Sequence, residues 1–161
     1  MTSNKPDLEL DRIAAHALHE VLAIQFKMAV FAPSPDQSSK AAGDEHWLTG
    51  TVNLESPQMK GGVLLQMSEP WLSTLNASLG NASRDPAALR SELLDLAGEL
   101  CNMVAGRIGA GLAAAGHICA LSTPNVIRGR QQGAENGSGI KCSRTSWTCA
   151  GGTLTLTVWT K

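Results

Sequence analysis

The chain contains no tyrosine and has few other aromatic residues, with 2 phenylalanines and 4 tryptophans among 161 residues. Aromatic side chains are the stacking platforms of proteins that bind single-stranded nucleic acid, so their scarcity argues against such a surface. The formal net charge of -1 also removes a general attraction to phosphate backbones. The composition therefore predicts a protein with no nucleic-acid partner.

Patterns that hold metals or form disulfide frameworks are also missing. The chain has four cysteines, which are Cys101, Cys119, Cys142 and Cys149. They form no CxxC pair and have no histidine at ligand spacing, so zinc is not expected. His16 and His19 lie three residues apart without a carboxylate cage and are expected on the surface. We predict no metal site, and we expect the cysteines to be buried free thiols.

Long uninterrupted hydrophobic runs are absent. The start of the chain is polar and lacks the apolar core of a secretory signal. Residues 103–121 are apolar and small, but Arg107 and His117 interrupt them and glycine is frequent, which indicates a helix and a strand instead of a membrane span. We expect one cytoplasmic domain over residues 1–161, with a flexible N-terminus at residues 1–8.

The strongest pattern that is present is a long helix from Asp85 to Gly116. Asp85 and Pro86 are typical of a helix start, and Gly116 is typical of a C-terminal stop. Apolar residues recur between them at helical spacing, namely Leu89, Leu93, Leu96, Leu100, Val104, Ile108 and Leu112. This stripe predicts one buried face.

The opposite side of this helix carries polar and small residues. With Leu100 at the centre of the buried stripe, Asp95, Glu99, Asn102 and Gly106 fall together on the side that faces away. Gly98 and Gly109 lie close to that side. Each glycine in a helix interior costs about 1 kcal/mol relative to alanine. Two explanations stay open here: close packing within the chain, or close approach by another protein.

The remaining segments alternate between helix and hairpin. Asp7 or Asp11 is expected to cap a helix that runs to about Met28, and Ser68 to cap a short one. A polar loop is expected at residues 33–44 and another at 129–139. Strands are expected at residues 48–54, 63–67, 117–122 with an extension at 126–128, 140–149 and 153–160. This order predicts an α+β fold, and the helix-then-hairpin unit occurs twice.

Two stretches of the sequence resemble the CheC/CheX/FliY family of chemotaxis phosphatases. Residues 96–106 read LAGELCNMVAG, which is similar to the ExxN helix of that family. Residues 121–129 read LSTPNVIRG, which is similar to the segment after that helix in CheX-type members. The resemblance covers the chain from about residue 10 onwards. It implies an antiparallel sheet packed by two long helices and a short one, with two intertwined helix-hairpin halves.

The resemblance also implies a function. Family members hydrolyse the aspartyl phosphate of a CheY-type response regulator in chemotaxis or two-component signalling. Asn102 would orient the attacking water and Glu99 would pair with a lysine of the regulator. Gly98 and Gly106 would let the regulator approach, and Asp95 is either a partner contact or a solubilising charge. The Mg²⁺ ion would belong to the regulator, so this chain would need no cofactor of its own.

Departures from the family leave alternatives open. CheC-type members carry a second ExxN in the first helix, where this chain has Glu20 followed by Ala23 in place of the asparagine. We therefore expect one active site. A CheX-like module that binds a regulator or motor component without turnover is the alternative function. CheX-like proteins pair through sheet edges, which implies a homodimer. Residues 109–114 match GxGxxA, but inside a helix, so dinucleotide binding is not expected.

Overall fold

The computed structural model describes residues 8–28, 46–81, 83–131, 137–149 and 152–161. The expected loop at residues 33–44 and residues 1–7 of the expected flexible N-terminus lie outside the described residues, as do residues 132–136 of the second loop. The elements are, in order, α1 (Leu8–His19), the π-helix η1 (Glu20–Gln25), β1 (Trp47–Glu55), β2 (Lys60–Ser68), α2 (Glu69–Ser78), α3 (Pro86–Ala114), β3 (Ala120–Leu121), β4 (Asn125–Arg128), β5 (Lys141–Cys149) and β6 (Gly152–Thr160). The α+β prediction is confirmed.

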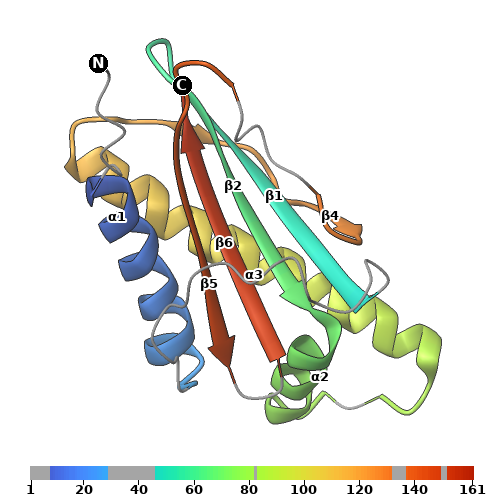
Figure 1. The fold of residues 1–161 in the computed structure, drawn as a ribbon. Helices are drawn as coiled ribbons and strands as arrows, with labels where there is room; N and C mark the ends of the chain where they lie inside the picture. Colours follow the sequence, from blue (N-terminus) through green and yellow to red (C-terminus); the bar gives the residue numbers. More distant parts are fainter. Residues whose placement is uncertain (1–7, 29–45, 82, 132–136, 150–151) are drawn as a thin grey trace.

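The strands form one antiparallel sheet in the order β3-β1-β2-β6-β5, and β4 also pairs with β1. Two hairpins, β1–β2 and β5–β6, are joined by the pairing of β2 with β6, in which Leu65 lies opposite Leu156. Helix α1 precedes the first hairpin but packs against β5 and β6, whereas α3 precedes the second hairpin and packs against β1 and β2. The two helix-hairpin halves are therefore intertwined, as predicted. Figure 1 shows α3 crossing behind the strands.

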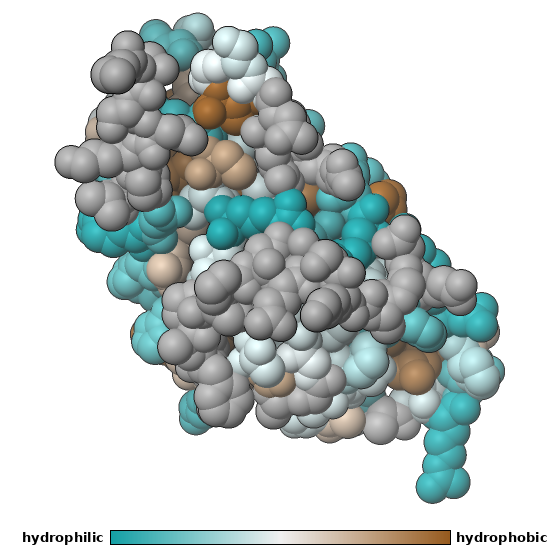
Figure 2. All heavy atoms as spheres, viewed as in Figure 1, coloured by the Kyte–Doolittle hydropathy of each residue, from teal (hydrophilic) through white to brown (hydrophobic). Residues whose placement is uncertain are grey.

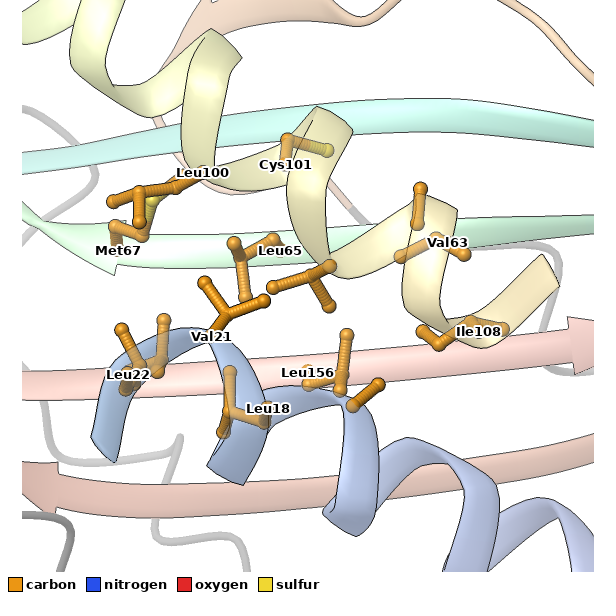
Figure 3. Close-up of a cluster of buried hydrophobic side chains, with 14 of the residues drawn as sticks. Leu18, Val21, Leu22, Val63, Leu65, Met67, Leu100, Cys101, Ile108 and Leu156 are labelled. Carbon is orange, nitrogen blue, oxygen red and sulfur yellow. The ribbon is translucent and has the colours of Figure 1, made fainter. Parts of the chain in front are cut away.

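The hydrophobic core lies between the sheet and these helices. Figure 3 shows Leu18 and Val21, Leu65 of β2 and Leu156 of β6 in one cluster with Leu100 of α3. All five side chains are at most 1% exposed. As expected, the apolar stripe of each helix faces the apolar side chains that alternate along the strands.

The other face of the sheet carries polar side chains, two of which bond to residues 129–131, just after β4. Thr49 Oγ1 donates a 2.6 Å hydrogen bond to Gly129 O, and Gln66 Nε2 donates a 2.8 Å bond to Gln131 O. Arg130 stacks over the ring of Trp47 at 4.3 Å. In the view of Figure 2, apolar side chains reach the coloured part of the surface only as small separate areas. The principal core therefore lies on the helix side of the sheet.

Two glycines allow the helices to pack closely against their neighbours. A Cβ atom added at Gly50 of β1 would lie 2.7 Å from Cys101 Cβ of α3. One added at Gly111 of α3 would lie 2.7 Å from Ile13 Cγ2 of α1. Both distances are shorter than real Cβ contacts allow. Gly50 thus lets α3 lie directly on β1, and Gly111 lets α1 cross α3.

Several sequence predictions need correction. The first helix is not α-helical throughout, because its last six residues form the π-helix η1. Ser68 does not cap α2 with its side chain, since its Oγ accepts a hydrogen bond from Thr153 N instead. The strand expected at 117–122 is only the two residues of β3, and β4 begins after Pro124. Among the residues that the structure describes, no helix is both long and apolar enough to cross a membrane.

The start of α3 offers a simple test of the helix prediction. The Asp85 carboxylate accepts a 3.2 Å hydrogen bond from Ala88 N, and Gly116 follows the helix with φ +94°. Replacing Asp85 by alanine leaves that N–H without its partner, so we expect a loss of about 1 kcal/mol of unfolding free energy. Urea denaturation measures this. Asp85→Asn keeps an accepting oxygen and is the control; equal stability of the two variants would contradict the capping role.

Candidate functional site

Helix α3 presents Glu99 and Asn102 to solvent. Both residues are exposed, whereas Leu100 and Cys101 between them are fully buried against the sheet. Because residues three apart on a helix lie one turn apart on the same face, the carboxylate and the amide share one exposed side of α3. The buried neighbours fix the rotation of the helix and hence the direction of this side.

The exposed pair is not engaged by the rest of the described chain. No hydrogen bond or ion pair among the described residues involves the side chain of Glu99 or Asn102. The nearby cation, Arg107, pairs instead with Glu20, its Nε lying 3.4 Å from Glu20 Oε2. His16 Nε2 lies 3.3 Å from the other Glu20 oxygen. The charge of Glu99 therefore remains available to a partner.

The structure groups most, but not all, of the residues expected to contact a partner. Asp95 and Gly106 are exposed, like Glu99 and Asn102. We call the face formed by these four residues the α3 ridge. A Cβ atom at Gly106 would meet nothing within 4 Å. Gly98 is half-buried and turned toward β4, since a Cβ atom there would lie 3.5 Å from Val126 Cγ2.

One side of the α3 ridge is bordered by β3 and β4. Leu121 of β3 lies against Gly109, 3.1 Å from the position of an added Cβ, and Val126 of β4 lies beside Gly98. At Gly98 and Gly109 the structure therefore favours the first of the two explanations left open by the sequence, close packing within the chain. The sequence did not identify Leu121 and Val126 as the contacting residues.

The site contains neither a metal cluster nor an activated thiol. Across the described residues, no group of three or more histidine, cysteine, aspartate or glutamate side chains can hold a metal ion. Cys101, which lies under the ridge, is free and buried, and burial raises the pKa of its thiol to about 12. It stays protonated near neutral pH. Cys149 is also buried, but Cys119 and Cys142 are only partly buried, so the expectation of buried thiols holds for two of the four.

The shape of the site indicates a macromolecular partner. A cavity of about 310 Å³ lies elsewhere, near the start of α1 and the end of α3, with Leu10, Met59 and Lys141 among its lining residues. Glu99 and Asn102 do not line it. A carboxylate and an amide on a helix surface cannot enclose a small molecule, whereas they can enter a site that another protein forms.

Solved structures share this fold over almost the full chain. A CheC-like superfamily protein from Shewanella sp. PV-4 matches with a TM-score of 0.75 and 23% identity, covering 96% of this chain and 99% of that protein. The chemotaxis protein CheX from Vibrio vulnificus matches with a TM-score of 0.76 and 20% identity, covering 95% and 97%. A structure of the CheX-CheY-BeF3-Mg²⁺ complex from Borrelia burgdorferi matches with a TM-score of 0.68 and 14% identity, covering 98% of each chain. These likenesses define the CheC-like class of fold.

The sequence itself identifies the family. The profile of the family described as chemotaxis phosphatase CheX matches residues 48–145, which include α3, β3 and β4. This chain belongs to the CheX family of chemotaxis phosphatases. None of the curated proteins matches it in sequence.

Proposed function

We propose that the α3 ridge hydrolyses the aspartyl phosphate of a CheY-type response regulator. The observation that carries this proposal is the exposed, unengaged pair of Glu99 and Asn102 on a rigidly packed helix. The Borrelia burgdorferi complex supports the choice of partner, because it combines a CheX with CheY, BeF3 and Mg²⁺. A chemotaxis phosphatase of the same family and fold is therefore expected to act on the same class of regulator.

The reaction requires few catalytic groups from the phosphatase itself. An aspartyl phosphate is an activated acyl phosphate, so the catalyst mainly has to place a water molecule in line with the phosphorus and stabilise charge. The Asn102 amide has a carbonyl oxygen that accepts from the water and an NH₂ group that donates to phosphate oxygens. Glu99, one turn earlier, pairs with a cation of the regulator and fixes how α3 docks. Gly106 leaves room for the regulator beside them.

The metal ion and the cellular compartment that we expect are those of the partner regulator. Mg²⁺ is expected to be bound by the regulator, where it neutralises the phosphoryl group, and this chain contributes no ligand to it. CheY-type regulators act in the cytoplasm, and we place this chain there. We further propose that two copies pair through their sheet edges as a homodimer, which light scattering on the purified chain tests.

Phosphate release tests the proposal directly. Each CheY-type receiver domain of the same genome is phosphorylated with acetyl phosphate, and loss of the phosphoryl group is followed with and without the chain. A shorter phosphate lifetime for at least one receiver is the expected result. Binding with an unchanged lifetime identifies the alternative function, a regulator-binding module without turnover. An unchanged lifetime without binding rejects both.

Filling the open space at Gly106 is expected to block docking. Gly106→Leu introduces a side chain on the ridge, so kcat/KM should fall about tenfold or more through steric exclusion of the regulator. Gly106→Ala is the matched control, because its Cβ atom meets nothing within 4 Å and replacing a helical glycine should raise the unfolding free energy by up to about 1 kcal/mol. Wild-type kcat/KM in the leucine variant would show that the regulator does not approach this position.

A further inference from the structure

We propose that residues 122–124, between β3 and β4, form a second contact wall for the regulator beside Asn102. This inference rests on the proposed function and adds a specificity-determining surface that α3 does not supply. The wall is defined as the corner formed by Ser122, Thr123 and Pro124. It would contact the receiver domain at the same time as the α3 ridge does.

The position of the corner follows from its two anchors. Leu121 contacts the Gly109 position of α3, and Val126 contacts the Gly98 position. Gly98 and Gly109 are about 16 Å apart along the helix axis at 1.5 Å per residue. The corner is therefore anchored to α3 at both ends. It lies alongside the stretch of α3 between residues 98 and 109, which includes Asn102 and Gly106.

The pairing of the strands shows why a corner forms at this level. Leu121 lies opposite Leu54 and Asn125 opposite Thr51. Three residues, 122–124, therefore face only Val52 and Asn53 of β1, which makes a bulge of one extra residue. Pro124 has no N–H to donate, so regular pairing cannot continue through it. Bulges of this kind change the direction of an edge strand and are common next to active sites.

The corner is held firmly yet remains open to solvent. Ser122 N donates to Asn53 O at 3.0 Å, and Asn53 N donates back to Ser122 Oγ at 2.9 Å. The Ser122 hydroxyl in turn donates to Thr123 O at 3.0 Å. Ser122 and Thr123 are nevertheless exposed, and Pro124 is half-buried. A fixed and exposed backbone is suited to recognition, because little conformational entropy is lost when a partner binds.

The corner and the ridge differ in chemistry. The α3 ridge offers two carboxylates, Asp95 and Glu99, which suit a basic partner surface. The corner is uncharged and offers the hydroxyl of Thr123 and the ring of Pro124. A receiver domain that fits both must carry a cation on one side of its phosphorylated aspartate and an uncharged surface on the other. A regulator with a bulky or charged loop on that second side would be excluded.

Binding and turnover measured together test this inference. The probe is the set of CheY-type receivers of the same genome, each activated with BeF3 and Mg²⁺, and Kd is measured by fluorescence titration. Thr123→Trp is expected to raise Kd about tenfold by steric exclusion and to leave kcat within about twofold at saturation. Thr74→Trp on α2 is the matched control, because Thr74 is also an exposed threonine but lies on a helix that packs against β2 and β6.

The outcomes separate this inference from the proposed function. Wild-type Kd in Thr123→Trp, with turnover lost in Asn102→Ala, overturns the wall and leaves the phosphatase proposal intact. Wild-type turnover in Asn102→Ala rejects the catalytic role, whereas the Kd comparison still reports on the wall. If no receiver binds the chain, both proposals are wrong. Thr123→Asp replaces the tryptophan variant if thermal unfolding shows that tryptophan destabilises the bulge.

Discussion

Replacing Asn102 by alanine is expected to lower kcat for dephosphorylation by about 100-fold, the loss typical of removing one positioned donor from a transition state. The amide would hold the water and donate to the phosphoryl oxygens, and alanine can do neither. Because the Asn102 side chain is exposed and makes no hydrogen bond among the described residues, the fold should not change. Phosphate release and Kd for the BeF3-activated regulator are the two measurements, and Kd should stay close to the wild-type value.

Two further variants make this result specific. Asn102→Asp keeps the size of the side chain but replaces the NH₂ donor with a negative charge near the phosphoryl group, so it should be at least as impaired as alanine. Asn81→Ala removes another exposed asparagine and should retain full activity. Equal rates of phosphate loss in wild type and Asn102→Ala would show that this amide does not take part in hydrolysis.

Replacing Gly50 by valine is expected to cost about 3 kcal/mol of unfolding free energy, at the upper end for overpacking a core. Its Cβ atom alone would lie 2.7 Å from Cys101 Cβ and 2.9 Å from Cys101 Sγ. Neither atom can move away easily, because the first is fixed to the backbone of α3 and Cys101 is fully buried. Urea denaturation measures the loss. Activity should fall as well, because lifting α3 from β1 moves Glu99 and Asn102.

A pair of compensating substitutions tests whether crowding causes this loss of stability. Gly50→Ala should be destabilising on its own, and Cys101→Gly removes both atoms that the new Cβ atom meets. If crowding is the cause, the double variant should be more stable than the sum of the two single losses predicts, since interacting sites are not additive. Strict additivity would mean that the cost arises in the strand itself and not at its contact with α3.

The elements that the sequence predicts well are those with a strong local signal. Helix α3 has a capping aspartate, a proline at its first position, a long apolar stripe and a C-terminal glycine, and all four have their expected places in the structure. The alternation of β1 and β6 is equally local. The two-residue β3, the one-residue bulge at 122–124 and the π-helical end of the first helix depend on contacts with distant segments, which local periodicity does not encode.

The same distinction between local signals and contacts of distant segments applies to the candidate site. The shared exposed face of Glu99 and Asn102 follows from helical spacing and from the buried stripe around Leu100, both of which can be read from the sequence. The pairing of Arg107 with Glu20 and the position of Val126 beside Gly98 join segments far apart in the chain. Only the fold brings them together, so the sequence left the partner of Arg107 and the roles of the individual glycines open.

The crossed arrangement of the two halves sets a condition on biosynthesis. Helix α1 leaves the ribosome before all three elements on which it packs, which are α3, β5 and β6. Helix α3 likewise depends on β1 and β2, whose neighbour β6 completes the sheet. During translation the apolar side of the first helix therefore stays partly uncovered until β5 and β6 have been made. Chaperone dependence is the expected cost of such a late-closing topology.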